Sequence, residues 1–238
     1  MTVVKSGQSK ATIFATIKKA LQTPSHVIDP GRPYKVPSAP RQFAADLSTR
    51  FVDEVTRLGA GCFVARSNDE AKGYVVDLIR KRGISRVALS NSPVVNQTGL
   101  SSALSSISIR PLIVDFDGCR DENELSVRKR NIRESLLQTE IGITGVTYGI
   151  ADTGTLVIGG DNEYNRLASL LPVIHLAILR SDQLLPDLPT ALEGLNRDGH
   201  VNQAITLITG PSRTADIELT LTIGVHGPKE LQVVLLQI

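Results

Sequence analysis

The chain has 238 residues, of which 41% are hydrophobic, 21% charged and 4% aromatic, and its formal net charge is +2. These values are ordinary for a globular protein with one sizeable core, which at this length needs no disulfide or metal to hold it together. Two cysteines are too few for a disulfide framework or an iron–sulfur cluster, and the scarce aromatic residues leave few stacking surfaces for single-stranded nucleic acid.

The sequence carries no signal for export or membrane insertion. No run of about 18 apolar residues is present, so we expect no membrane span. The N-terminal residues lack the apolar stretch and cleavage site of a secretory signal. The sequence therefore predicts a cytoplasmic protein.

Positive charge is concentrated in the N-terminal region. Residues 1–50 carry eight basic and two acidic side chains, a net charge of +6, whereas the remainder carries −4. A basic arm can steer towards an acidic partner or nucleic acid. No base-reading motif accompanies this charge, so we favour a solvated terminus and expect no nucleic-acid partner.

The first 58 residues predict two helices separated by a proline-rich strap. Apolar residues recur at helical spacing over residues 9–22, and five prolines then exclude regular structure across 23–40. A second helix is predicted over about 41–58, ending at Gly59. We therefore divide the chain into an appendage, residues 1–40, and one domain, residues 41–238.

Strands and helices alternate over the next 80 residues. Ser67 and Glu70 have the spacing of a capping box and open a helix that ends at Gly83. A weaker helix follows at 94–104, and a charged helix at 121–139. Short apolar strands precede and separate them at 62–65, 86–90 and 109–114. The charged helix is predicted to turn four apolar side chains inward: Leu125, Ile132, Leu136 and Leu137. This alternation predicts a parallel sheet.

The second half changes character. Extended segments at 143–151 and 155–158 flank a turn at Asp152-Thr153-Gly154, which predicts an antiparallel hairpin. Further strands are predicted at 173–179, 204–209, 217–223 and 231–236, with a helix at 182–197. The predicted fold class is therefore α/β, with a mixed, largely parallel sheet and helices on both faces.

Four loops carry the residues suited to chemistry, and ligands of open α/β sheets bind beyond the carboxyl ends of strands. The loops are Asp152–Thr155, Gly159–Arg166, Thr209–Asp216 and Val225–Lys229. Glycine lets a backbone approach a ligand, while hydroxyl and guanidinium groups donate to phosphate or carboxylate oxygens. The candidate ligand-binding residues are Thr153, Gly154, Thr155, Asn162, Arg166, Gly210, Ser212, Arg213, Thr214 and Asp216. The alternative interpretation is that these loops are ordinary turns.

Three side chains are candidates for proton transfer: His226, Glu163 and Asp152. His226 lies in a rigid Gly-Pro turn, where an imidazole can exchange a proton near neutral pH. Asp152 is equally suited to forming the turn beside Gly154. His175, within an apolar strand, is better suited to a hydrogen-bonded core position. The spacing of the acids and histidines matches no recognised metal pattern, so we expect no metal.

At these loops the sequence resembles the lactate-utilisation (LUD) domain family, and in particular its shorter subunit without iron–sulfur clusters. The segments that carry the resemblance are Ile143–Gly145, Ile150–Thr155, Asn162–Glu163 with Asn165–Arg166, Leu170–Pro172 with His175, Thr209–Ser212 with Thr214–Glu218, and Gly224–Pro228. The resemblance is strong over about residues 120–238 and extends to 41–119 by pattern alone.

The resemblance implies a fold similar to the group of sugar-phosphate isomerases and CoA transferases. It also implies a role in the oxidation of L-lactate to pyruvate beside iron–sulfur partner subunits. With two cysteines and no dinucleotide fingerprint, this chain would hold no redox cofactor itself, and any clusters would belong to those partners.

Three functions remain open from the sequence. The first is the cluster-free subunit of a lactate-oxidising complex, which binds a small anion or organises the assembly. Arg166 or Arg213 would hold the carboxylate, and His226 or a nearby acid would take the hydroxyl proton. The second is a stand-alone enzyme for a phosphorylated or thioester ligand, with Glu163 or Asp152 as the reactive group. The third is a non-catalytic binding module that docks through its N-terminal arm.

Overall fold

The computed structural model describes residues 12–16, 18–19, 46–115, 121–159, 163–199, 204–215, 221–224 and 226–237. The chain forms two compact units, Met1–Arg41 and Gln42–Ile238. In the first unit residues 12–16 and 18–19 are helical, within the predicted helix, and Ile13 and Phe14 are exposed. The predicted proline-rich strap and Cys119 lie outside the described residues.

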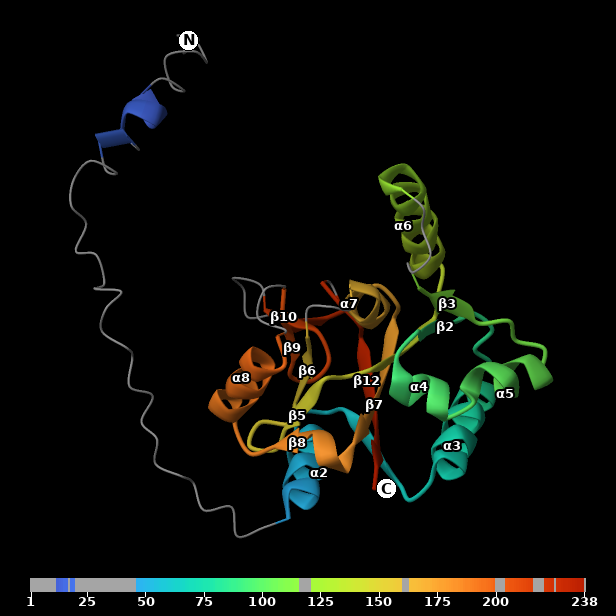
Figure 1. Ribbon diagram of the computed structural model, residues 1–238. Helices are drawn as coiled ribbons and strands as arrows, with labels where there is room; N and C mark the ends of the chain where they lie inside the picture. Colours follow the sequence, from blue (N-terminus) through green and yellow to red (C-terminus); the bar gives the residue numbers. More distant parts are fainter. Residues whose placement is uncertain are drawn as a thin grey trace. The chain divides into compact units, whose positions relative to one another are not determined.

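The second unit is built on a six-stranded sheet in which every strand is parallel to its neighbours (Figure 1). Its strands, in spatial order, are β1 (Gly61–Ala65), β12 (Glu230–Leu236), β7 (Ile174–Arg180), β4 (Ile141–Gly145), β2 (Val87–Ser90) and β3 (Leu112–Val114). All residues of β2 and β4 are buried, as expected for strands covered on both faces. The predicted, largely parallel α/β sheet is confirmed.

Three helices cover one face of this sheet: α3 (Asn68–Lys81), α4 (Pro93–Gln97) and α5 (Leu100–Ser106). The Ser67 hydroxyl accepts a hydrogen bond from the Glu70 amide at 3.1 Å, so α3 begins with the predicted cap. The single helix predicted over 94–104 is wrong, because Gly99, with a φ of 69°, separates α4 from α5.

The opposite face is covered by helices and by a second sheet (Figure 1). The helices are α2 (Leu47–Arg57), α6 (Glu122–Leu137) and α7 (Glu163–Leu170). The second sheet has the order β8 (Leu184–Leu185), β5 (Tyr148–Ile150), β6 (Thr155–Ile158) and β9 (Thr206–Ile208). Helix α8 (Leu188–Arg197) packs against its outer side. Strands β5 and β6 form the predicted antiparallel hairpin.

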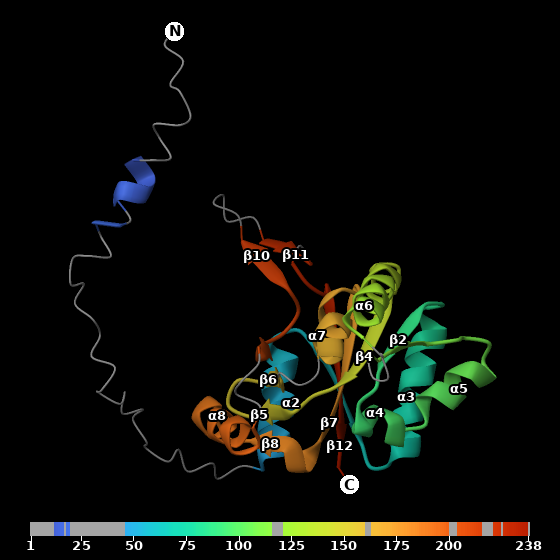
Figure 2. The ribbon, with the colours of Figure 1, turned by 45° about the horizontal axis from the view of Figure 1, so that its top comes forward.

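A two-stranded ribbon, β10 (Arg213–Ala215) with β11 (Leu221–Ile223), completes the described elements. Figure 2 shows this ribbon projecting above β6 and α2 in that view. The third predicted loop therefore contains a strand, which sequence periodicity did not indicate. Residues 216–220, including the predicted start of the last but one strand, lie outside the described residues.

Three further predictions differ from the structure. The extended segment predicted over 143–151 is two strands in different sheets, β4 and β5, because the chain leaves the large sheet after Gly145. Leu137 was predicted to face inward but is 60% exposed, since Leu136 occupies the buried position of the last turn of α6. The helix predicted over 182–197 begins only at Leu188, where Asp187 caps it; a 3-10 turn (η1, Ser181–Gln183) and β8 precede it.

Candidate functional site

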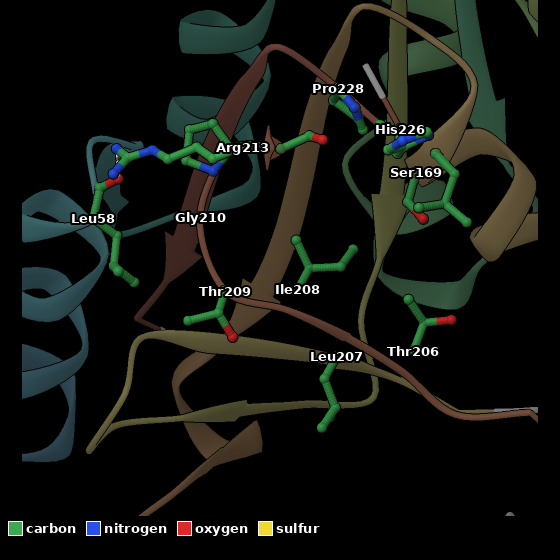
Figure 3. Close-up of a pocket in the computed structure, with 14 residues that line it drawn as sticks. Leu58, Ser169, Thr206, Leu207, Ile208, Thr209, Gly210, Arg213, His226 and Pro228 are labelled. Carbon is green, nitrogen blue, oxygen red and sulfur yellow. Dashed lines mark hydrogen bonds between the residues drawn. The ribbon is translucent and has the colours of Figure 1, made fainter. Parts of the chain in front are cut away.

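The third and fourth predicted loops converge on one cavity of about 380 Å³ (Figure 3). This volume lies within the range of small-molecule sites, about 300–1,000 Å³. The end of α2 and the end of α7 complete the lining. The lining residues are Leu58, Ser169, Leu170, Thr206–Arg213 and His226–Pro228. Four segments, spread along the chain from Leu58 to Pro228, thus share one concave surface.

Backbone hydrogen bonds hold the two loops together. The Ser212 amide donates to the Pro228 carbonyl at 2.9 Å, and the Gly224 amide donates to the Ser212 carbonyl at 3.0 Å. Gly210 has a φ of +85°, a left-handed conformation that favours glycine, and a side chain there would approach Leu58. These backbone contacts within the protein therefore fix the wall of the cavity.

Arg213 supplies positive charge at one end of the cavity, and Figure 3 shows its guanidinium turned towards Leu58. Its Nη2 donates to the Leu58 carbonyl at 2.7 Å. Leu58 is the C-cap of α2, so Arg213 satisfies a carbonyl at the negative end of that helix. This bond fixes the orientation of the predicted ligand-binding arginine.

His226 and Ser169 line the part of the cavity away from Arg213 in the view of Figure 3. The His226 side chain is exposed, so solvent and ligand can both reach its ring. Ser169 is buried and donates from its hydroxyl to the Arg166 carbonyl at 2.9 Å, inside α7. Of the two predicted proton-transfer residues whose side chains the structure describes, His226 lines the cavity and Asp152 does not.

The first predicted loop supports the cavity from behind. Thr155 Oγ1 lies 2.7 Å from Thr153 Oγ1 and 2.8 Å from Thr209 Oγ1, and Thr209 lines the cavity. Gly154, with a φ of +60°, packs so closely on α2 that a Cβ would lie 2.7 Å from the Val55 amide nitrogen. The predicted ligand-binding residues Thr153, Gly154 and Thr155 are therefore not among the lining residues.

Asp152, predicted as a catalytic acid, lies outside the cavity lining and pairs with α2. Its Oδ1 is 3.1 Å from Arg50 Nη2, and the Asp152 side chain is 19% exposed against 42% for Arg50. An aspartate in this position ties the hairpin turn to the helix. Asp152 thus has a structural contact that accounts for its place in the turn.

The second predicted loop leads into α7, and the end of this helix lines the cavity. Glu163 begins α7, and Arg166 lies within it and is not among the lining residues. Glu163 and Thr214 are described only by their backbone, in α7 and β10. Asn162 and Asp216 lie outside the described residues. The sequence did not indicate Leu58, Ser169, Leu170 or Thr206–Ile208, because a helix end and a short strand carry no signal for ligand binding.

The cavity lies at the amino ends of the large sheet, not at the carboxyl ends where we predicted the loops to gather. Leu58 precedes β1, Ser169 precedes β7 and His226 precedes β12. Because these strands are parallel, their amino ends share one edge of the sheet. The general rule for open α/β sheets was therefore the wrong guide for these loops.

His175, at the centre of the sheet, is 1% exposed, and its Nε2 lies 2.9 Å from Thr144 Oγ1. Burial lowers the pKa of His175 to about 3, so the ring is neutral at physiological pH. Within the described part of the chain its Nδ1 has no hydrogen-bond partner. This geometry makes His175 a core residue.

Burial raises the pKa of the Cys62 thiol to about 11, which disfavours the reactive thiolate. Across the described ranges, no three His, Cys, Asp or Glu side chains gather as a metal site would require. The same residues contain no helix long and apolar enough to cross a membrane.

The parallel sheet, the second sheet on one face and the cavity at the amino edge define an α/β protein with a cavity of small-molecule size. The family model described as the LUD domain matches residues 48–236, and the chain belongs to this family. The resemblance found in the sequence is confirmed.

Two relatives that match most or nearly all of the chain share one name. The chain is 30% identical to "Lactate utilization protein C" of Anoxybacillus flavithermus over 70% of both chains. It is 27% identical to the protein of the same name from Deinococcus radiodurans over 98% of both. A crystal structure of a DUF162 family protein from Deinococcus radiodurans has the same fold, with a TM-score of 0.55 and 22% identity over 80% of this chain and 96% of that chain.

Proposed function

We propose that this chain serves lactate utilisation as a subunit without iron–sulfur clusters, and that the cavity at the amino edge binds a small anion for that process. The observation that carries the proposal is the convergence of loops Thr209–Arg213 and His226–Pro228 on one cavity. The names of the relatives, one of which matches nearly the whole chain, support the assignment to lactate utilisation.

The lining suits a carboxylate ligand. Arg213 places a guanidinium at one end, which attracts a carboxylate, and the hydroxyls of Thr209 and Ser212 offer further donors. His226, at the other part of the cavity, is the side chain that would accept a proton from a hydroxyl group. A hydroxy acid such as L-lactate presents both groups.

Oxidation of lactate to pyruvate releases two electrons and two protons. In our proposal the electrons pass to iron–sulfur clusters of partner subunits, and this chain holds the substrate or organises the assembly. The two cysteines of this chain cannot supply the four thiolates of a cluster, and burial keeps the Cys62 thiol protonated. Redox chemistry therefore falls to the partners.

Purification of the tagged chain from cells grown on L-lactate tests the assembly. We expect iron-containing partner proteins to co-purify, and deletion of the chain to abolish growth on L-lactate. Complementation with His226→Gln or Arg213→Gln should restore growth poorly. Arg197→Gln, at the end of α8, is the matched control and should restore it fully. Isolation of the chain alone, together with normal growth of the deletion strain on L-lactate, would refute the proposal.

Ligand binding is tested separately on the purified chain. A ligand at 100 times its dissociation constant stabilises the folded state by about 2.7 kcal/mol, which thermal unfolding detects readily. We expect such stabilisation by L-lactate or pyruvate, and its loss in His226→Gln and Arg213→Gln but not in Arg197→Gln. Co-purification without this stabilisation would leave the chain an organising subunit only.

A further inference from the structure

A second cavity, of about 420 Å³, lies at the opposite edge of the large sheet from the first. Its lining comes from the segments that follow three neighbouring strands: Ser92–Val94 and Gln97 after β2, Gly145–Tyr148 after β4, and Arg180, Asp182 and Gln183 after β7. None of these residues lines the first cavity. The proposed function leaves this cavity unused.

The topology of the sheet marks this place. From β2 the chain proceeds to β3 at the edge of the sheet, whereas from β4 it proceeds in the opposite direction, to β7. The neighbouring strands β2 and β4 therefore send their connections apart. Ligands of open α/β sheets bind beyond the carboxyl ends of the strands at such a switch point. The second cavity occupies that position.

Side chains hold the cavity open in a fixed form. The Gln183 amide donates to the carbonyls of Val146 at 2.8 Å and Thr147 at 3.2 Å, and its Oε1 accepts from the Arg180 amide at 2.9 Å. On the other side, a Cβ on Gly145 would lie only 2.7 Å from Ser92 Oγ. The connections after β7, β4 and β2 are thus fastened to one another before a ligand binds.

Ser92 presents a hydrogen-bond donor to this cavity. It is 5% exposed, and its Oγ accepts from the Gly145 amide at 3.2 Å and from the Ser90 hydroxyl at 3.3 Å. Both lone pairs of the hydroxyl oxygen are then used. Within the described residues no acceptor takes the Ser92 proton, so this donor remains for a ligand.

Arg180 adds charge to the same cavity. Its Nε and Nη2 donate to the Asp182 carboxylate at 3.0 and 2.6 Å. A guanidinium has five N–H groups, so this pair leaves donors on the Arg180 side chain, while Asp182 keeps lone pairs that accept hydrogen bonds. The site therefore combines a cation and a buried hydroxyl donor with one carboxylate acceptor.

We propose that this second cavity is a binding site for a small oxyanion ligand, a phosphate monoester or a carboxylate, whose body carries hydroxyl groups. Arg180 and Ser92 bind the oxyanion, and Asp182 accepts from a hydroxyl of the ligand. The site is separate from the first cavity and does not depend on the role in lactate utilisation.

The test is a titration of the full, uniformly labelled chain followed by amide-resolved NMR. The probes are glycerol 3-phosphate, D-glycerate and neutral glycerol, which share hydroxyl groups and differ in the oxyanion. We expect one or both anions to shift the amide signals of Gly145, Val146 and Thr147 at the second cavity, whether or not those of Gly210 and Gly227 at the first cavity also move. The anion that binds more tightly identifies the oxyanion.

Two variants test the assigned residues. Arg180→Gln should raise the dissociation constant at least tenfold, and Ser92→Ala roughly two- to tenfold, in keeping with the strength of charged and neutral hydrogen bonds. His226→Gln, in the first cavity, is the control and should leave the value unchanged. Unfolding curves identify any variant that fails to fold, in which case the shift pattern of the unaltered chain decides.

Three outcomes would overturn the proposal: no shift with either anion at millimolar concentration, equal shifts with glycerol, or shifts confined to Gly210 and Gly227. None of these results would bear on growth on lactate or on co-purification. Conversely, failure of those two tests would leave the second site intact.

Discussion

Protonation of His175 should make the folded state sensitive to acid. The ring is buried in the sheet, and burial lowers its pKa to about 3, against 6.5 for an exposed histidine. Between these two pH values the unfolded chain binds a proton on His175 and the folded chain does not. The free energy of unfolding therefore falls as the pH falls through this window, and the effect vanishes above about pH 7.

The magnitude follows from the two pKa values. One pKa unit corresponds to about 1.4 kcal/mol, so lowering the pH from 7 to 5 should cost about 2 kcal/mol through this single group. A loss of this size is a substantial part of the stability of a typical domain, about 5–15 kcal/mol. It is also well within the resolution of urea denaturation.

His175→Gln removes the titrating ring and keeps an uncharged group able to bond Thr144. The free energy of unfolding is measured in urea at pH 7 and at pH 5 for both proteins. Between these pH values we expect the loss in the His175→Gln variant to be about 2 kcal/mol smaller than the loss in the unaltered chain. The carboxylates contribute equally to both proteins and cancel in the comparison.

Thr144→Val is the matched control, because it breaks the hydrogen bond to His175 Nε2 and leaves the ring in place. It should cost about 1–3 kcal/mol at both pH values and keep the full dependence on pH. Equal pH dependence in the His175→Gln variant and the unaltered chain would refute the assignment of acid sensitivity to this ring.

Three other substitutions or reactions test the packing around the first cavity. Gly142→Ala would place a Cβ 1.9 Å from the Ala168 carbonyl oxygen and should lower the free energy of unfolding, measured in urea, by about 1–3 kcal/mol. The control is Gly73→Ala in α3, whose Cβ meets no atom within 4 Å; it should raise the free energy of unfolding by up to about 1 kcal/mol. Thr155→Val removes two hydroxyl contacts behind the cavity and should cost about 1–2 kcal/mol in the same assay; no change would show that the contacts contribute nothing. Burial raises the pKa of Cys62 to about 11, so little of its thiol is in the reactive thiolate form at pH 8. We therefore expect iodoacetamide to alkylate Cys62 far more slowly in the folded chain than in urea, as measured by peptide mass spectrometry. Equal rates would contradict its burial.

Periodicity and capping predicted the large sheet and helix α3 well, although they missed the break at Gly99 between α4 and α5. The signals were strong there because the central strands β2 and β4 are fully buried and α3 begins at a capping serine. Ser67 caps α3 as its spacing with Glu70 indicated, and the apolar runs before Ala65 and Ser90 are strands. These features depend on local sequence, so a single chain is enough to predict them.

The second sheet was predicted less well because its strands are short. β5, β6 and β9 have three or four residues and β8 has two, too few for a periodic pattern to separate them from turns. Leu184 and Leu185 therefore read as the start of a helix. Pairing with β5, a contact between segments 35 residues apart, decides their conformation, and local sequence does not contain it.

The candidate site was predicted in part, for the same reason. Glycine, proline and hydroxyl residues correctly marked the loops at Gly210 and His226 as places where the backbone turns beside a cavity. They marked Asp152 and Gly154 equally, yet these pack on α2. A turn that approaches a helix and a turn that approaches a ligand need the same residue types, so only the tertiary contacts separate them.

The second sheet explains why the two cavities lie at opposite edges of the large one. After β4 the chain makes the hairpin of β5 and β6 before α7 returns it to the amino end of β7; after β7 it passes through β8, α8 and β9 before returning to β12. Both crossovers therefore run through one small sheet. Its strand β9 lines the first cavity at the amino edge, and Tyr148 at the start of β5 lines the second at the carboxyl edge. A plain helical crossover would leave the amino edge with short turns. The paired strands inserted into the crossovers supply the long loops that form the first cavity. The second cavity, at the carboxyl edge, lies at the switch point between β2 and β4 that the strand order defines.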